Sequence, residues 1–324
     1  MKMRALIAVL PVVTAVAVGA SPAVADSTSS VSANWSGYQV TPAYGSNGFS
    51  DVSGSWVQPS ANCNTGNAAY SAFWVGLGGG AQAQSLEQVG TQADCSSSGQ
   101  ASYYAWYELV PNAPVQLSMQ IVPGDQIAAE VNVSGNSVTI KITDQTTGAS
   151  FNRVLQMSNP DTSSAEWIAE APSSCQNGVG SVCTPLPLAD FGTAKFSNAS
   201  ATADGYTGTI TDPSWSAQPV ALDSSLGGQG GYAYDLAGGS TGGSSAGAQP
   251  TSLSSDGSSF SVSYLPNGLS QASSAAGSGV SGGGYGGGGY AYGGGGYAPP
   301  GAYGGSGGNP YGIDLNSLAA LLGL

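Results

Sequence analysis

The chain contains no histidine, and that absence limits the chemistry its side chains can perform. Without histidine, a Ser-His-Asp triad, a Cys-His pair and an HExxH zinc site are all excluded. Carboxylates, carboxamides, tyrosines and backbone N–H groups remain as acids, bases and hydrogen-bond donors. A carboxyl group can act as general acid and general base, and a glutamine amide can stabilise an oxyanion while it orients a water molecule. One glutamate and one glutamine would therefore suffice for the acid hydrolysis of an acyl bond.

Two glutamates lie four residues apart in the segment SAEWIAEA, residues 164–171, although only 7% of the chain is charged. In a helix, Glu166 and Glu170 would share one face. In a strand they would share a face with Ile168, and Trp167 would point to the opposite side. Local propensity favours the helix, whereas the surrounding sequence favours the strand. In a strand Glu170 lies about 13 Å from Glu166, which gives it a structural role rather than a catalytic one.

Short alternating segments surround these residues. Residues from about 30 to 266 are rich in Val, Ile, Thr, Tyr and Ser and are interrupted by turn residues at short intervals. Residues 128–144 give the clearest example, because apolar and polar residues alternate on both sides of a turn at Gly135-Asn136. Further alternating segments are 52–57, 103–109 and 260–264. Many short strands with frequent turns predict an all-β fold, an antiparallel β-sandwich.

The N-terminal end differs from this central part. Residues 1–25 carry two cations, an apolar run and a small-residue end, which is the layout of a secretory signal peptide. A membrane anchor is the weaker alternative, because the run is short and Pro11 interrupts it. We expect a secreted, extracellular protein with a short N-terminal or pro segment at 26–33 and the sandwich domain at 34–266. No later segment is long and apolar enough to span a bilayer, so we expect a soluble chain with no membrane partner.

Residues 267–324 form a low-complexity tail of glycine runs interrupted by tyrosines. Such a composition buries too little apolar surface to offset its backbone entropy, which predicts disorder. A flexible exported tail is the favoured interpretation. The alternative is weak adhesion to a surface or polymer through the tyrosines.

Four cysteines in an exported chain predict two disulfides. Three pairings are possible, and the short glycine-containing spacing between Cys175 and Cys183 favours a local bridge there, which leaves Cys63 for Cys95. Zinc is the rival interpretation, but the chain has no CxxC pair and no histidine. We expect neither a metal nor a cofactor.

The charge balance is strongly acidic. After the predicted cleavage, three basic residues stand against 18 acids. Nucleic acid is an improbable partner because phosphate binding needs clusters of lysine and arginine. When the carboxylates protonate in acid, few cations remain to repel one another, so the composition suits work at acid pH.

Six sequence blocks occur in the order found in the glutamic peptidases, the eqolisins. The blocks are Asn34-Trp35-Ser36-Gly37, Ala72-Phe73-Trp74-Val75-Gly76, Leu86-Glu87-Gln88-Val89-Gly90, Tyr104-Ala105-Trp106-Tyr107-Glu108, Ala165-Glu166-Trp167-Ile168 and Leu188-Ala189-Asp190-Phe191-Gly192. The likeness extends over about residues 33 to 266, nearly the whole predicted sandwich, and leaves the tail uncovered. The chain resembles this family of acid endopeptidases, and the resemblance implies two curved antiparallel sheets of the concanavalin-like or jelly-roll type. It also implies protein or peptide substrates, and we expect a monomer.

By this resemblance Gln88 and Glu166 form the catalytic dyad. Glu166 is expected to act as general base on a water molecule and then to protonate the leaving amine. Gln88 is expected to position that water and to stabilise the oxyanion. Glu87, the neighbour of Gln88, points to the opposite face of a strand, so only one of the two can line the cleft.

The resemblance assigns substrate-binding or supporting positions to Trp35, Trp74, Trp106 and Glu108. The chain also departs from the family pattern. Gly78 stands where an acidic residue is expected, Gln92 and Tyr104 lie near expected aspartates, and Val110 replaces a tyrosine.

Two other functional classes remain open from the sequence. One is a carbohydrate-active or carbohydrate-binding sandwich, with Glu108 and Glu166 as paired carboxylates. The other is a non-enzymatic surface protein in which the tail is the functional part.

Overall fold

The computed structural model describes residues 29–64, 66–80, 85–175, 183–228 and 246–269. The predicted signal peptide and nearly all of the predicted tail lie outside these residues. The regular secondary structure of the described part is β-strand, apart from one short 3₁₀ helix, η1 (Ser224–Gly228). Among these residues, no helix has the length and apolar character needed to cross a bilayer.

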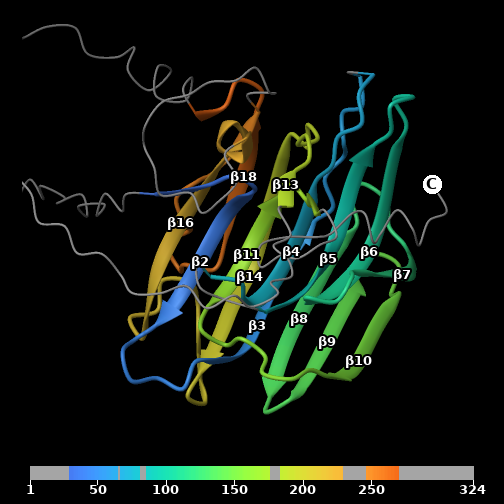
Figure 1. The fold of residues 1–324 in the computed structure, drawn as a ribbon. Helices are drawn as coiled ribbons and strands as arrows, with labels where there is room; N and C mark the ends of the chain where they lie inside the picture. The colour runs from blue at the N-terminus through green and yellow to red at the C-terminus, as the bar shows by residue number, and fades with distance from the viewer. Residues whose placement is uncertain (1–28, 65, 81–84, 176–182, 229–245, 270–324) are drawn as a thin grey trace, which may run out of the picture.

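The strands form one continuous hydrogen-bonded sheet that folds over into two packed layers (Figure 1). In hydrogen-bonding order, the first layer consists of β10 (Ser150–Gln156), β9 (Ser137–Asp144), β8 (Gln126–Ser134), β3 (Phe49–Val57), β14 (Thr193–Ala203), β18 (Phe260–Leu265) and β17 (Gly247–Pro250). The order continues in the second layer with β16 (Trp215–Asp223), β2 (Trp35–Pro42), β11 (Ala165–Glu170), β4 (Ala72–Gly78), β5 (Leu86–Cys95), β6 (Ala101–Val110) and β7 (Val115–Gln120).

The remaining strands are short. They are β1 (Ser30–Ser32), which pairs in parallel with β16, β15 (Tyr206–Gly208), which pairs with β14, and the two-stranded sheet of β12 (Ser173–Cys175) and β13 (Cys183–Pro185). The predicted antiparallel β-sandwich is confirmed, with the two layers joined at one edge through β17 and β16. The segment predicted at 26–33 contributes β1 to the sheet.

The main hydrophobic core fills the space between the layers. Its largest buried side chains include Trp56 and Phe196 from the first layer and Phe73 and Trp167 from the second. The predicted hairpin at 128–144 is present as β8 and β9, with Gly135 in the left-handed region (φ 59°) at the turn. Segment 165–170 is strand β11, so the surrounding sequence prevailed over local helix propensity.

The second layer has a second buried cluster on the face that points away from the core. It includes Trp35, Trp74, Trp106 and Ile168. We call this side of the second layer the site face. Strands β11, β4 and β5 therefore have both faces buried along their whole length, and β2 and β6 along most of theirs, which explains the absence of an alternating pattern.

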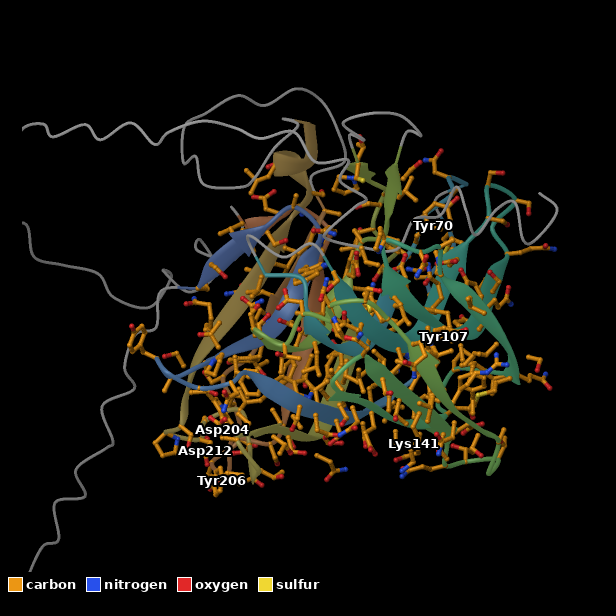
Figure 2. All side chains as sticks on the ribbon, turned by 60° about the horizontal axis from the view of Figure 1, so that its bottom comes forward. Tyr70, Tyr107, Lys141, Asp204, Tyr206 and Asp212 are labelled. Atoms are coloured by element: carbon orange, nitrogen blue, oxygen red, sulfur yellow. A yellow bond between two sulfur atoms is a disulfide. The ribbon has the colours of Figure 1, made fainter. Side chains whose placement is uncertain are left out.

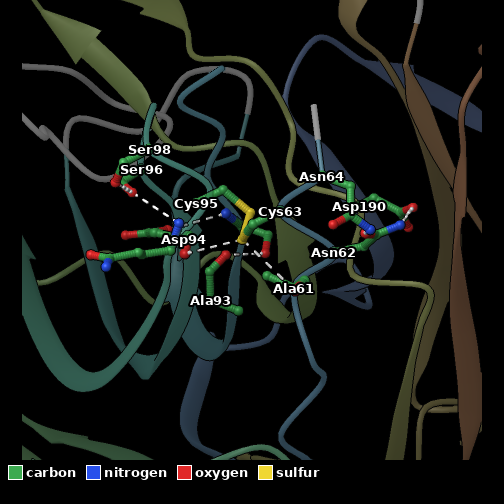
Figure 3. The surroundings of a disulfide bond; sticks show 12 residues. Ala61, Asn62, Cys63, Asn64, Ala93, Asp94, Cys95, Ser96, Ser98 and Asp190 are labelled. Atoms are coloured by element: carbon green, nitrogen blue, oxygen red, sulfur yellow. Dashed lines mark hydrogen bonds between the residues drawn. A yellow bond between two sulfur atoms is a disulfide. The ribbon is translucent and has the colours of Figure 1, made fainter. Parts of the chain in front are cut away.

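One predicted disulfide is present, between Cys63 and Cys95 (Figure 3). It ties the loop before β4 to the end of β5, near an Asn62–Asp190 side-chain hydrogen bond of 3.1 Å. Cys175 and Cys183 are register partners in the β12–β13 sheet. Their bridge stays a prediction, because the side chain of Cys175 lies outside the description.

Charged side chains of the described residues form a single ion pair, Lys141 with Glu130 at 3.3 Å. Figure 2 shows Tyr206 and Asp212 close together and apart from Lys141. The Tyr206 hydroxyl donates to the Asp212 carboxylate at 3.0 Å. Asp212 is thus held by a neutral donor, whereas Glu130 is held by a cation.

Candidate active site

One residue from each of five adjacent strands lies in a single row across the second layer. In the order β2, β11, β4, β5, β6 the row is Gln39, Glu166, Gly76, Gln88 and Glu108. Register partners in an antiparallel sheet point to the same face. The fold therefore places Glu166 and Gln88 on one face, although they lie 78 positions apart in the sequence.

Gly76 separates the two residues and adds no side chain between them. A Cβ atom there would come within 3.0 Å of the Glu87 carbonyl oxygen and 3.2 Å of the Gln88 Cβ. Two strand spacings put the backbones of β11 and β5 about 10 Å apart. Across that distance the long Glu166 and Gln88 side chains can reach a common small molecule.

Glu166 is completely buried, and its two carboxyl oxygens differ. Oε1 accepts a hydrogen bond of 2.9 Å from Nε2 of Gln39. Oε2 has no partner among the described residues. Burial raises the pKa of Glu166 well above its ordinary value, and the negative charges of Asp161 and Glu87 add to the rise, whereas the nearby Ser164 hydroxyl and the Gln39 amide oppose it.

Gln88 is also completely buried. Its Nε2 donates to Oε2 of Glu108 at 2.8 Å, and Glu108 is itself buried. The Gln88 carbonyl oxygen has no partner among the described residues. The Glu108 contact fixes the orientation of the amide, which leaves one N–H and the carbonyl oxygen for other groups.

Three tryptophans lie on the same face. Trp35 and Trp74 make an edge-to-face contact with ring centroids 5.0 Å apart. Trp74 and Trp106 lie in the row next to the dyad, with Gly90 between them. The indole nitrogen of Trp106 donates to no group in the described part of the chain. All of the substrate-binding positions expected from the sequence thus lie on the site face, together with the dyad.

Glu170 holds one of these tryptophans. Its Oε2 accepts a hydrogen bond of 2.7 Å from the Trp74 indole, and its Oε1 accepts one of 3.1 Å from the Asn34 amide. The carboxyl group is fully buried. These contacts engage Glu170 in orienting Trp74, four residues along β11 from Glu166. Within the described ranges, no three potential ligands gather to hold a metal ion.

Glu87 and Trp167 point to the core side, as the strand period requires. Glu87 is in register with Leu77 and Leu109, which belong to the main core. Its Oε1 accepts a hydrogen bond of 3.3 Å from the backbone N–H of Asp161, and burial raises the pKa of Glu87 to about 8. The Trp167 indole donates to the Ser53 carbonyl at 2.8 Å.

The structure shows which residues surround two of the positions that depart from the family pattern, Gly78 and Tyr104. Gly78 has a left-handed backbone (φ 84°), which favours glycine, and a Cβ there would approach the Asp161 Cβ to 2.6 Å. Asp161 thus supplies a carboxylate beside the position where the pattern has an acid. Tyr104 donates to the buried Asp94 at 3.2 Å, and burial raises the pKa of Asp94 to about 8.

Sequence reasoning missed Gln39 and Asp161. Gln39 is 127 positions from Glu166, and no local pattern indicates which strands pair over such a separation. Asp161 lies outside the strands, where alternation carries no information. One sequence signal could have indicated Gln39: the side-chain period of a strand puts it on the same face as Trp35, a residue expected at the site.

Residues 33–229 match the sequence profile of the Peptidase A4 family. The chain belongs to the Peptidase A4 family. Among its relatives is Aspergillopepsin-2 of Aspergillus niger, 29% identical over 199 residues, which make up 54% of this chain and 66% of that protein. The match therefore spans slightly less than two thirds of that relative's length.

Solved structures of eqolisins resemble this A4 family member. Scytalido-glutamic peptidase, crystallised with a transition state analog inhibitor, has a TM-score of 0.55 and 26% identity, covering 72% of this chain and 98% of that one. SCP-B, an eqolisin in a complex with the tripeptide Ala-Ile-His, has a TM-score of 0.51 and 24% identity with the same coverage. The family expected from the six sequence blocks is thereby confirmed.

Proposed function

We propose that this chain hydrolyses peptide bonds with Gln88 and Glu166 as its catalytic dyad. The observation that carries the proposal is the row in which the two side chains share one face across Gly76, each with an unpartnered buried oxygen among the described residues. Membership of the Peptidase A4 family supports it. Oε2 of Glu166 and the carbonyl oxygen of Gln88 are the acceptors that a hydrolytic water molecule needs.

The raised pKa of Glu166 changes the expected order of proton transfers. A carboxyl group whose pKa lies above the working pH carries a proton at the start, so it cannot begin as a base. We infer that neutral Glu166 first donates its proton to the scissile carbonyl oxygen as water attacks the carbonyl carbon. The same carboxyl group then accepts the surplus proton of that water, which leaves a neutral diol and a neutral Glu166.

Collapse of the diol completes the reaction. Glu166 protonates the leaving nitrogen, the C–N bond breaks, and the carboxyl group recovers a proton from one diol hydroxyl. The products are a carboxylic acid and an amine, and the dyad returns to its first state. Because Gln39 occupies Oε1, Oε2 is the oxygen that exchanges these protons.

Gln88 supplies the polar partner for the attacking water and the developing oxyanion. Its carbonyl oxygen can accept from the water, and the N–H not used by Glu108 can donate to the diol oxygen. Glu108 keeps the amide in this orientation. We propose that Trp35, Trp74 and Trp106 contact the peptide on either side of the scissile bond.

The paired carboxylates of a glycosidase are a weaker interpretation of this face. Glu108 and Glu166 stand three strand spacings apart, with Gly76 and Gln88 between them. One oxygen of Glu108 is already engaged by the Gln88 amide. The arrangement thus offers one carboxyl group for proton transfer rather than a facing pair.

The proposal also includes the location, oligomeric state, substrates and working pH that the sequence leads us to expect. We propose that the chain is exported through residues 1–25, acts as a monomer on protein or peptide substrates and works in acid. The tail from residue 267, almost all of it outside the described part, is proposed as a flexible extension. Export, the monomeric state and the tail do not enter the chemistry of the dyad, whereas the acid pH does.

An unfolded protein incubated with the purified chain should be cleaved between about pH 2 and 5, because the raised pKa of Glu166 favours its neutral form in acid. Cleavage should resist pepstatin-type inhibitors of aspartic peptidases, because no pair of aspartates takes part. Mass spectrometry of the fragments identifies hydrolysed peptide bonds. Cleavage or binding of a polysaccharide without proteolysis would favour the carbohydrate alternative and overturn the proposal.

A further inference from the structure

We infer that Gln39 is a positioning residue for Glu166, which fixes the carboxyl group so that Oε2 faces the substrate. This inference rests on the proposed function. No sequence block of the dyad contains Gln39, which reaches the site from β2. Its side chain is half-buried, whereas Glu166 is completely buried.

The geometry gives Gln39 one well-defined contact in the site. It is the register partner of Glu166 across the β2–β11 pair, and its Nε2 donates to Oε1 at 2.9 Å. A primary amide donates through N–H at any pH, so this contact exists for both protonation states of Glu166. Because Oε1 is occupied, the carboxyl group cannot rotate to exchange its two oxygens without losing the bond.

The same arrangement recurs on the other side of Gly76. There the Gln88 amide donates to Glu108 at 2.8 Å, as the Gln39 amide donates to Glu166. Each pair joins an amide and a carboxyl group from adjacent strands. The row is therefore two amide–carboxyl pairs with a glycine between them, and the inner members, Glu166 and Gln88, are the proposed dyad.

Gln39 also contributes to the protonation of Glu166. The groups that act on this carboxyl group are Asp161 and, above its own pKa of about 8, Glu87, whose negative charges favour the neutral form, and the Ser164 hydroxyl and Gln39 amide, which favour the ionised form. Gln88 and Gly76, on the neighbouring strands, bring no charge. Removal of the Gln39 donor should therefore raise the pKa of Glu166 further.

The Gln39→Leu variant should lower kcat by about tenfold at every acid pH and leave KM nearly unchanged, because one hydrogen bond to the catalytic group is lost. The Gln39→Glu variant distinguishes positioning from packing. In strong acid the introduced carboxyl group is protonated and can donate to Oε1, so activity should approach that of the parent chain. As the pH rises the introduced group ionises, loses the donor and disfavours the Glu166 carboxylate that forms after the first proton transfer, so activity should fall at a lower pH than in the parent.

Gln156→Leu is the matched control, because this exposed amide on β10 bonds only to Ser137 at 3.0 Å. It should keep the parental pH profile, and thermal unfolding at pH 3 should show that all variants are folded. A Gln39→Leu variant with parental kcat and pH profile, beside an inactive Glu166→Gln variant, would overturn this inference alone. A fully active Glu166→Gln variant would instead overturn the proposed function. Acid rescue in Gln39→Glu but not in Gln39→Leu is the supporting result.

Discussion

Replacement of Glu166 by glutamine should lower kcat/KM on a peptide substrate by about a thousandfold or more in acid. The amide keeps the size of the carboxyl group and can still accept from Gln39, but it cannot give up and recover a proton at Oε2. Both halves of the proposed reaction need that proton. Initial rates at pH 3 to 4 with a fluorogenic peptide measure the loss.

The fold of this variant should be intact, which separates lost chemistry from lost structure. A buried neutral carboxyl group and an amide differ little in volume, so the melting temperature in acid should stay close to that of the parent. Glu130→Gln is the control for removal of a glutamate, since Glu130 is a surface residue paired with Lys141. It should keep full activity, and residual activity of Glu166→Gln above one tenth of the parental value would contradict the assigned role.

The melting temperature of the parent chain should be highest in acid and should fall by about 10 °C or more between pH 5 and pH 9. Two buried carboxyl groups and one half-buried one cause this, because desolvation raises the pKa of Glu87 and of Asp94 to about 8 and that of Asp51 to about 6. Their ordinary values are 4.5 for glutamate and 3.8 for aspartate. Calorimetry across this pH range measures the effect.

The direction follows from the protons that each state binds. Between the ordinary and the raised pKa, the folded chain still holds a proton that the unfolded chain has released. The free energy of unfolding therefore falls as the pH rises through this window, and the loss is complete above the raised pKa. For Glu87 the window runs from pH 4.5 to about pH 8, and the free energy of unfolding falls across it by on the order of 5 kcal/mol. Hydrogen bonds lower the pKa of Asp204 and of Asp212. Their contribution to the free energy of unfolding is therefore lost as the pH falls, but only in stronger acid.

The Glu87→Gln variant isolates one contribution. Glu87 faces the core rather than the dyad, and with a pKa of about 8 it carries no charge in acid, so its replacement should leave the chemistry at acid pH in place. An amide cannot ionise, and the fall in melting temperature between pH 5 and pH 9 should shrink by several degrees. An unchanged fall would show that Glu87 ionises in the folded chain as readily as in the unfolded one.

The strand pattern could be predicted from the sequence because alternation determines which side chains share a face. It placed Gln88 opposite Glu87 and Glu166 opposite Trp167, and the register agrees in both cases. The family blocks then indicated which glutamine and which glutamate to pair. Neither argument needs knowledge of long-range pairing.

Contacts between distant strands could not be predicted in this way. The order β2, β11, β4, β5 brings Gln39 beside Glu166 and puts Gly76 between the dyad residues, and only tertiary pairing determines that order. The raised pKa of Glu166 also depends on tertiary structure, because burial causes it. An ordinary glutamate suggested a base in the acid range, whereas complete burial favours the neutral form, and the proposed order of proton transfers starts from that form.

The central claim is that Gln88 and Glu166 act as one unit across Gly76. A double-mutant cycle on kcat/KM at acid pH, with Glu166→Gln, Gln88→Ala and the two combined, tests it most directly. Gln88→Ala alone should cost about a hundredfold or more, and the combined variant should be little worse than Glu166→Gln, because groups that serve one step are not additive. Fully multiplicative losses, or full activity in either single variant, would contradict the account.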